Sequence, residues 1–582
     1  MDPTNANTAL ASAFVEELAR CGLRHAVLSP GSRSTPPALA LWREPAIEVT
    51  VIVDERSAAF FALGAAQAGG APVAILCTSG TAAANLHAAI CEADHAAVPL
   101  LALTADRPPE LRGVGAGQAI DQLKLYGDSV RWFCEVGTHD ADDEGLLHYR
   151  STACRAYAAA RGEPRPGPVH LNLAWREPLA PLPVEGAVTA TDPLALEGRD
   201  ERPLTAVTPF DAEPSRFLLD EVAKHIDEAR SGVIVAGRQL DPELREPLAH
   251  LARVAGMPIL AEPTSQLRCG PHDRSHLVTA YDLLLRDERF RGTASPDLVL
   301  RFGELPTSKP LRAWLAASGA DQIVVDPLAG WHEPSRRAAA LLRADPTELA
   351  AGWAARLGEE REAPSAWLDA ERAAREAIVA ELAEHPEPTE PGLQLALGAA
   401  YADGELVYTA SSMPIRDQEA FLPSTAAAAT FLCNRGANGI DGLISSGIGA
   451  AHATGRPTTI VTGDLGLLHD LGGLAALRET STPVRIVVVD NDGGGIFHFL
   501  PQEKSLPSDE FEALLGTPRG IDVAKAAALF DLPHSRIDDL GDLPNALAAG
   551  TSLIEVKTDR KANVAIHRQL TQRVQAAIAG LP

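Results

Sequence analysis

The pattern of hydrophobic and polar positions alternates between short apolar strands and amphipathic helices over the first 180 residues. Each predicted strand runs into a short loop and then a helix, which is typical of a parallel sheet covered on both faces. The predicted strands are 25–29, 47–53, 73–77 and 100–104, and the predicted helices are 8–21 and 57–67, with two more beginning near residues 35 and 81.

The same alternation returns twice after a linker at 177–214, where proline and acidic residues are concentrated. A long polar helix is predicted at 365–384 with Ser365 as its N-cap, and a proline-rich break follows at 385–391. The predicted strands are 233–236, 298–302 and 322–325 in the middle region, and 406–409, 459–462 and 485–489 in the last, where a helix is expected at 467–478.

The first and last regions have the pattern of two copies of one architecture. A chain of 582 residues also exceeds a single hydrophobic core, since such cores stop growing near ~250–300 residues. We therefore expect an α/β protein with three doubly wound parallel-sheet domains, at 1–185, 186–385 and 386–582.

Composition excludes several classes of protein. No apolar run approaches the ~20 residues that span a bilayer, so no membrane insertion is expected. The first residues lack the basic and apolar segments of a secretory signal. Seven cysteines without metal-ligand spacing, and seventeen histidines in no ligand-spaced cluster, predict reduced thiols and core or surface imidazoles in a cytoplasmic protein.

The net charge is −26, from 51 basic and 77 acidic side chains, which disfavours nucleic-acid binding. Arginine supplies most of the positive charge, as either a salt-adapted host or a GC-rich genome would produce. Clustered arginines at loop positions stand out against this acidic background, because a site for anions must overcome the repulsive field locally.

Two polar residues follow consecutive predicted strands near the end of the chain. Asp464 follows the strand 459–462, and Asn491 comes 27 positions later, after the strand 485–489. The carboxyl ends of parallel strands are where open α/β sheets bind ligands. A carboxylate, an amide oxygen and a loop carbonyl near Gly493 would give hard oxygen ligands for Mg²⁺ or Mn²⁺. The alternative is ordinary turn chemistry.

Two further segments have the composition of ligand-binding loops. Glu55 follows the end of the strand 47–53 and opens a helix, where either a catalytic carboxyl or a solvated first-turn glutamate favoured by the helix dipole would fit. The glycine-rich loop at 434–442 allows a ligand to approach the backbone closely.

The spacing from Asp464 to Asn491 resembles the metal–diphosphate motif of thiamine-diphosphate enzymes, and the segment 54–59 is similar to their glutamate segment. The resemblance implies a homodimer or homotetramer with sites at the subunit interface, where Glu55 faces the pyrimidine ring. Ile440 would lie under the bent cofactor, or be an ordinary core isoleucine. The implied cofactor-binding residues are Glu55, Ile440, Asp464, Asn491, Gly493, Ile496 and Phe497, with Asp464, Asn491 and Gly493 as metal ligands.

Three segments, 29–36, 104–111 and 117–122, are similar to the 2-succinyl-5-enolpyruvyl-6-hydroxy-3-cyclohexene-1-carboxylate synthases, a thiamine-diphosphate family of menaquinone biosynthesis. The resemblance implies decarboxylation of 2-oxoglutarate and addition of the succinyl unit to isochorismate. Both substrates are dicarboxylates, and arginine binds carboxylates with two parallel hydrogen bonds. The implied isochorismate residues are Ser32, Arg33, Arg107, Gln118 and Lys309, and those for 2-oxoglutarate are Ser412, Arg416 and Arg435.

Other interpretations remain open at this stage. Any single arginine is also compatible with a surface salt bridge, and Leu465, Pro310 and the pair Asp490 and Asp492 depart from the family pattern. An enzyme of the acetolactate-synthase type is the alternative function, although no flavin or NAD fingerprint is present. A catalytically inactive regulatory relative is disfavoured, because Glu55, Asp464 and Asn491 are all present.

Overall fold

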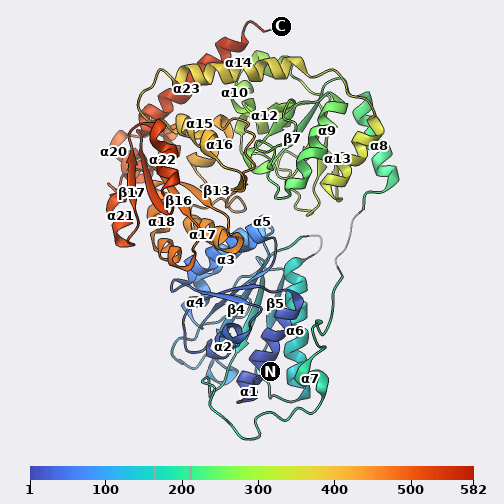
Figure 1. Ribbon diagram of the computed structural model, residues 1–582, viewed down its shortest axis with the longest axis vertical. Helices are drawn as coiled ribbons and strands as arrows, with labels where there is room; N and C mark the ends of the chain where they lie inside the picture. The colour runs from blue at the N-terminus through green and yellow to red at the C-terminus, as the bar shows by residue number, and fades with distance from the viewer. Residues whose placement is uncertain (163–164, 209–212, 582) are drawn as a thin grey trace. The chain divides into compact units, whose positions relative to one another are not determined.

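The computed structural model contains three six-stranded sheets in which every pair of neighbouring strands is parallel, and it describes residues 1–162, 165–208 and 213–581 (Figure 1). This confirms the predicted α/β class with three doubly wound sheets. The strands of the first sheet are β1 (His25–Leu28), β2 (Glu48–Val51), β3 (Val73–Cys77), β4 (Leu100–Asp106), β5 (Trp132–Glu135) and β6 (Val169–Ala174). Those of the second are β7 (Gly232–Ala236), β8 (Ile259–Ala261), β9 (Leu277–Val278), β10 (Leu298–Phe302), β11 (Asp321–Val325) and β12 (Ala338–Leu342). Those of the third are β13 (Leu406–Thr409), β14 (Thr430–Leu432), β15 (Thr458–Gly463), β16 (Val484–Asp490), β17 (His534–Ile537) and β18 (Ser552–Lys557).

The first and third sheets share one strand order. They run β2-β1-β3-β4-β6-β5 and β14-β13-β15-β16-β18-β17, so corresponding strands take corresponding places. The predicted duplication of one architecture is therefore confirmed. In both sheets the order reverses beside the first strand, between β1 and β3 and between β13 and β15. Loops that leave neighbouring strands in opposite directions open a crevice at such a point.

The chain divides into two compact units that do not follow the sequence order. The first comprises Met1–Phe210, Asn434–Arg456 and His469–Pro483, and the second comprises Asp211–Cys433, Pro457–Leu468 and Val484–Pro582. The first sheet lies in the first unit, and the second and third sheets lie in the second.

The helices of the first unit are α1 (Ala6–Cys21), α2 (Thr35–Arg43), α3 (Glu55–Gly69), α4 (Thr81–Asn85), α5 (His87–Ala96), α6 (Asp143–Arg161), α7 (Pro193–Glu197) and α17 (Leu443–Thr454), with the 3₁₀ helices η1 (Pro109–Leu111) and η4 (Leu471–Glu479). In the second unit they are α8 (Arg216–Glu228), α9 (Arg245–Ala255), α10 (Tyr281–Leu284), α11 (Glu288–Thr293), α12 (Lys309–Ala317), α13 (Pro346–Leu357), α14 (Ser365–Leu382), α15 (Glu390–Ala400), α16 (Met413–Phe421), α19 (Gln502–Ser505), α20 (Ser508–Phe511), α21 (Val523–Leu529), α22 (Leu543–Ala548) and α23 (Arg560–Ile578). Helix α18 (Asp464–His469) follows β15, and the short elements η2 (Pro242–Leu244), η3 (Pro263–Ser265), η5 (Gly495–Phe499), the π-helix η6 (Glu512–Gly516) and η7 (Leu540–Asp542) complete the set.

The apolar runs of the central strands are explained by burial on both faces. In β7, Ile234 and Ala236 contribute to one hydrophobic core, and Val233 and Val235 contribute to another. Side chains alternate along a strand, so a strand covered on both faces needs apolar residues at successive positions.

Helices α3 and α17 lie side by side although they are far apart in the sequence (Figure 1). Glycines permit the close approach. A Cβ at Gly64 would lie 1.8 Å from the Ser446 carbonyl oxygen, and one at Gly449 would lie 2.0 Å from that of Phe61. The glycine-rich composition of α17 therefore follows from its packing on α3.

Two sequence predictions were wrong. The helix expected at 467–478 is divided between α18 and the 3₁₀ helix η4, because Asp470 leaves the helical conformation and Gly472 and Gly473 favour the α-helix poorly. The Asp470 carboxylate instead accepts hydrogen bonds from the backbone N–H and hydroxyl of Ser445, at 2.7 and 3.0 Å. Ser365 is also not the N-cap of α14, since it lies inside the helix and Pro364 precedes it.

Across the described parts of the chain, no helix has the length and apolar character needed to traverse a bilayer.

Candidate functional site

The third sheet places Asp464 and Asn491 at the ends of neighbouring strands. Strands β15 and β16 pair in register from Thr458 with Val484 to Gly463 with Val489. Asp464 follows the first strand directly, and Asn491 follows the second. Both side chains thus leave the carboxyl edge of the sheet, where their spacing in the sequence predicted them.

Each of these residues has an oxygen without a hydrogen-bond partner among the described residues. They are Oδ2 of Asp464, whose side chain is 1 % exposed, and Oδ1 of Asn491. Burial raises the pKa of the Asp464 carboxyl to about 7, and the nearby carboxylates of Asp490 and Asp492 also raise it. Buried oxygens without partners are costly, and a divalent cation would satisfy both. The donor set therefore fits Mg²⁺ or a similar hard cation.

A residue that the sequence analysis missed determines how Asn491 is oriented. Glu390 at the start of α15 accepts a hydrogen bond from Asn491 Nδ2 at 2.9 Å and another from the Thr558 hydroxyl at 3.2 Å. This contact directs the amide oxygen of Asn491 away from Glu390. In the sequence, Glu390 has only the signal of an acidic residue in the first turn of a helix, after the N-cap Thr389.

The loop after β16 supplies the predicted Gly493 in a conformation that glycine favours. Gly493 has φ +137°, and a Cβ there would lie 2.1 Å from the Gly516 carbonyl oxygen. The two aspartates around Asn491 have other partners. Asp490 forms an ion pair of 2.7 Å with Lys557, and Asp492 accepts backbone hydrogen bonds from Arg519 and Gly520. The carboxylates that depart from the family pattern therefore stabilise the loop.

A cavity of about 330 Å³ in the second unit brings together three predicted residues. Lys309 at the start of α12, Arg416 on α16 and Ile496 on η5 all line it. Phe499 of η5 lines the same cavity, whereas the predicted Phe497 packs toward Gly494. The cavity is in the size range of small-molecule sites and combines cationic groups with apolar walls.

Buried carboxyl groups adjoin the cationic side chains of this cavity. Burial raises the pKa of Glu419 to about 8, with Glu262 and Asp282 as further causes, and the Tyr281 hydroxyl donates to Glu419 at 2.7 Å. Burial also raises the pKa of Asp417 to about 8.

The imidazole of His567 lines the cavity, with Nε2 3.0 Å from Asp417 Oδ1, and burial lowers its pKa to about 4. The same burial acts in opposite directions on the two partners. Burial therefore disfavours the charged form of both Asp417 and His567.

Ser412 adopts an unusual backbone conformation beside Arg416. It has φ +76° and ψ −133°, a sparsely populated region for any residue with a Cβ. Its carbonyl oxygen accepts a hydrogen bond from Arg416 Nη1. Strain of about 1–3 kcal/mol is typical of such conformations, which concentrate at ligand-binding sites.

In the first unit, Glu55 begins α3 directly after β2 and its N-cap Asp54. Its side chain is half-buried, and it lies near the Cys77 thiol at the end of β3, because its carboxylate contributes, after burial, to raising the pKa of that thiol. Glu55 thus lies at the carboxyl edge of the first sheet, close enough to Cys77 for its charge to act on that thiol.

The loop after β1 brings Arg33, and the loop after β4 brings Arg107 and Gln118, to the same edge. Arg33 is 8 % exposed, and its pKa is lowered, first by burial and then by the nearby Arg107. Arg107 donates to the Gly117 carbonyl at 3.0 Å, and Gln118 donates to that of Ser79 at 3.2 Å. Two neighbouring guanidinium groups in a partly buried loop cluster favour an anionic ligand.

Ser32 is exposed and forms the turn that precedes α2, where its carbonyl oxygen accepts from Thr35. The structure therefore places it in the loop that carries Arg33, with its main-chain contacts directed within that turn.

The loop that carries Arg435 and Ile440 is anchored to α5. The carboxylate of Glu92, which is 3 % exposed, accepts hydrogen bonds from the backbone N–H groups of Gly436 and Ala437, both at 2.6 Å. Arg435 and Ile440 are half-buried in this loop. Glu92 gave no signal in the sequence, because an acid within a helix is ordinarily solvated.

Three family models match successive parts of the chain. They describe the N-terminal binding domain of thiamine pyrophosphate enzymes (residues 8–125), the middle domain (200–400) and the C-terminal binding domain (422–560).

Three similar curated proteins carry the name 2-succinyl-5-enolpyruvyl-6-hydroxy-3-cyclohexene-1-carboxylate synthase. The protein from Chloroflexus aurantiacus is 43% identical over 98% of this chain and 96% of its own length. Those from Myxococcus xanthus and Halobacterium salinarum are each 41% identical over 99% of both chains.

Proposed function

Because this chain belongs to the family of the 2-succinyl-5-enolpyruvyl-6-hydroxy-3-cyclohexene-1-carboxylate synthases, we propose that it is a thiamine-diphosphate-dependent transferase of menaquinone biosynthesis. The reaction joins the succinyl unit of 2-oxoglutarate to isochorismate with loss of carbon dioxide. The full-length similarity to relatives of this name disfavours the alternative of an enzyme of the acetolactate-synthase type.

The observation that carries the proposal is the pair of buried oxygens, on Asp464 and Asn491, that lack partners among the described residues. These oxygens and the Gly493 carbonyl would hold Mg²⁺ or Mn²⁺, which in turn would bind the diphosphate of the cofactor. When bound, thiamine diphosphate supplies the chemistry that releases carbon dioxide from a 2-oxo acid and transfers the remaining acyl unit.

The side chains around the cofactor site have separate tasks. Glu55 would hold a proton at its carboxyl oxygen, opposite the pyrimidine ring. Glu390 holds the Asn491 amide so that its oxygen stays available. Ile440, Ile496 and Phe497 would exclude water from the bound cofactor, because each presents an apolar surface.

The cationic side chains would bind the substrate carboxylates. We infer that Arg33, Arg107 and Gln118, with Ser32 and Lys309, bind isochorismate, and that Arg416, with Ser412 and Arg435, binds 2-oxoglutarate. The two neighbouring arginines of the first unit support the former assignment. The cavity that Lys309 and Arg416 line supports a carboxylate at that position. Arginine holds a carboxylate with two parallel hydrogen bonds, which fixes its orientation.

The family resemblance also supports a homodimer or homotetramer, with domains at 1–185, 186–385 and 386–582. Sedimentation of the purified protein tests the assembly. All seven cysteines are free thiols, which supports a reducing, cytoplasmic compartment.

A paired turnover assay tests the proposed function. Purified protein with thiamine diphosphate and Mg²⁺ receives isochorismate together with either 2-oxoglutarate or pyruvate, and carbon dioxide release and isochorismate loss are followed. We expect stoichiometric loss of isochorismate with 2-oxoglutarate alone. Turnover with pyruvate alone would contradict the assigned substrates but agree with the assigned cofactor. No turnover in either arm would overturn the proposed activity.

A further inference from the structure

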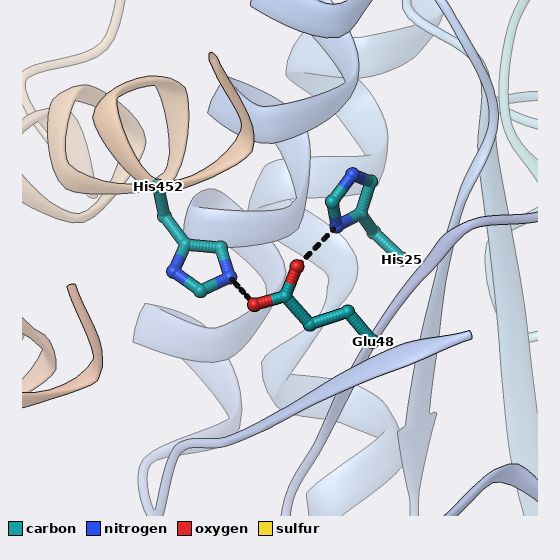
Figure 2. Close-up of side chains that lie close together, drawn as sticks. All are labelled: His25, Glu48 and His452. Atoms are coloured by element: carbon teal, nitrogen blue, oxygen red, sulfur yellow. Dashed lines mark ion pairs between the residues drawn. The ribbon is translucent and has the colours of Figure 1, made fainter. Parts of the chain in front are cut away.

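Two histidines and a glutamate from distant parts of the sequence meet in the first unit (Figure 2). They are His25 on β1, Glu48 on β2 and His452 in the last turn of α17. One ligand atom from each, His25 Nδ1, a Glu48 carboxylate oxygen and His452 Nε2, lies within 4.8 Å of the others. The sequence analysis assigned all histidines to core or surface roles, because their spacing along the chain gives no sign of this cluster.

The backbone fixes the relative positions of two of the ligands. His25 and Glu48 are Cα partners in the parallel ladder between β1 and β2, so their side chains project from the same face of the sheet. Each is also the first residue of its strand. The cluster therefore lies at the amino ends of these strands, whereas Glu55 and Arg33 follow the carboxyl ends, and the two sites are separate.

The three ligand groups lie close enough together to share one metal ion. Glu48 Oε2 lies 3.6 Å from His25 Nδ1, and Glu48 Oε1 lies 3.3 Å from His452 Nε2. Ligand atoms that bind zinc at 2.0–2.2 Å in a tetrahedron are about 3.3 Å apart. Figure 2 shows the carboxylate between the two imidazoles, with one oxygen directed to each ring.

The hydrogen bonds of His452 favour a metal ligand at Nε2. Its Nδ1 lies 2.9 Å from the Glu479 carbonyl oxygen, and only an N–H at Nδ1 can donate there. A neutral His452 therefore carries its lone pair on Nε2, which faces Glu48 and lies 3.2 Å from the Thr50 hydroxyl. A backbone carbonyl that fixes the tautomer in this way is the usual second partner of a metal-bound histidine.

An unpartnered nitrogen, access for water and a helix end also favour a metal ion at this cluster. The buried Nδ1 of His25 has no hydrogen-bond partner among the described residues, although it is directed at the Glu48 carboxylate. The side chain of Glu48 is 58% exposed, against 30% for His25 and 11% for His452, so water has access to a fourth position. The carboxyl end of a helix also attracts positive charge, and His452 lies in the last turn of α17.

We propose that His25, Glu48 and His452 form a binding site for a divalent transition-metal ion such as Zn²⁺, with water as the fourth ligand. The bound ion ties α17 to strands β1 and β2. Two imidazoles and one carboxylate select transition metals over Mg²⁺, which prefers oxygen ligands alone. The alternative is an imidazolium–carboxylate triad that holds no metal.

Cobalt(II) titration of the full-length protein distinguishes a metal site from a metal-free imidazolium–carboxylate triad. Metal-free protein in excess Mg²⁺, which occupies the proposed oxygen-ligand site, receives Co²⁺, and the visible absorption of four-coordinate Co²⁺ is recorded. We expect one equivalent of bound Co²⁺ that Zn²⁺ displaces. The variants His452→Gln and Glu48→Gln should weaken binding by about tenfold or more. His385→Gln is the matched control, because His385 lies 3.6 and 3.5 Å from Glu381 and Glu387 but belongs to no possible metal-ligand group among the described residues.

Thermal unfolding keeps the test independent of the spectrum. Zn²⁺ should raise the melting temperature of the wild type and of His385→Gln, but not that of Glu48→Gln, which we expect to fold because the Glu48 side chain is mostly exposed. Absence of the four-coordinate absorption at micromolar wild-type protein would overturn the proposal. Equal Co²⁺ affinity in wild type and His452→Gln would overturn it as well.

Discussion

The side-chain amide of Asn491 donates from Nδ2 to Glu390 Oε1 at 2.9 Å, and this single contact determines which end of the amide faces the predicted metal site. Burial raises the pKa of Glu390 to about 8, with Asp417 as a further cause. Glu390 therefore acts on the metal through Asn491, as a positioning residue.

Replacing Glu390 tests this relationship. We expect Glu390→Ala to lower the apparent affinity for thiamine diphosphate at fixed Mg²⁺ by about 10- to 100-fold, because Asn491 loses the acceptor that orients it. Glu390→Gln is the matched control, since its amide oxygen accepts the same hydrogen bond. Fluorescence titration with the cofactor measures both. Equal affinities in the two variants would show that Glu390 does not orient Asn491.

Asp464 should be required for cofactor binding through the cation. We expect Asp464→Asn to lose most Mg²⁺-dependent thiamine-diphosphate binding, because a neutral amide binds a hard cation more weakly than a carboxylate. A chelator should have the same effect on the wild type, and readdition of Mg²⁺ should reverse it. Calorimetry of cofactor binding with and without the chelator measures both effects. Undiminished binding in the variant would remove Asp464 from the metal site.

Glu55 should be needed for turnover and not for folding. We expect Glu55→Gln to retain the melting temperature and cofactor binding, but to lower kcat by about 10²- to 10⁴-fold, because the amide cannot exchange a proton. Glu144→Gln is the control, since Glu144 is also an acidic residue in the first turn of a helix and is exposed. The steady-state rate with both substrates is the measurement. A rate equal to the wild type would exclude Glu55 as the catalytic carboxyl.

The two arginines assigned to 2-oxoglutarate should affect that substrate more than the cofactor. We expect Arg416→Ala and Arg435→Ala each to lower kcat/KM for 2-oxoglutarate by an amount equivalent to about 2–5 kcal/mol, because a buried carboxylate loses its charged partner. Arg372→Ala is the control, since Arg372 is 69% exposed and pairs with Asp369 at 3.0 Å. If kcat/KM for 2-oxoglutarate and the cofactor affinity are both unchanged, the two arginines have a structural role and do not bind the substrate.

Buried Glu419 should make stability fall as the pH rises. Its pKa is raised from 4.5 to about 8, so between these values the folded protein binds a proton that the unfolded chain releases. Stability is therefore greatest below about pH 4.5 for this group and decreases toward pH 8, by at most about 1.4 kcal/mol per pH unit.

Melting temperatures between pH 5.5 and 8.5 at constant ionic strength test this dependence. We expect Glu419→Gln, which keeps an acceptor for Tyr281, to flatten the decrease, and Glu376→Gln on an exposed position of α14 to leave it unchanged. A slope in Glu419→Gln as steep as in the wild type would contradict the assignment.

The local pattern of apolar residues predicts the central strands, and contacts between distant residues explain where the prediction failed. Strands such as β3, β10 and β13 are mostly apolar runs, and their predicted bounds match the observed ones. The helix expected at 467–478 failed, because the packing of Asp470 against Ser445 overrides the local pattern. The edge strand β17 was missed, because its sequence, His-Ser-Arg-Ile, carries no apolar run. The edge strand β12 was missed although its sequence, Ala-Ala-Ala-Leu-Leu, is apolar, because alanine and leucine favour a helix.

The sequence by itself determined the strand–loop–helix order, the position of Asp464, Asn491 and Glu55 directly after strands, and the resemblance that names the family. Only the tertiary structure decided which side chains meet. Glu390 reaches Asn491 across 101 positions, Glu92 reaches Gly436 across 344, and His452 reaches Glu48 and Thr50 from another part of the chain. Hydrogen bonds and ion pairs of this range depend on the packing of distant elements, and residue spacing along the chain does not encode them.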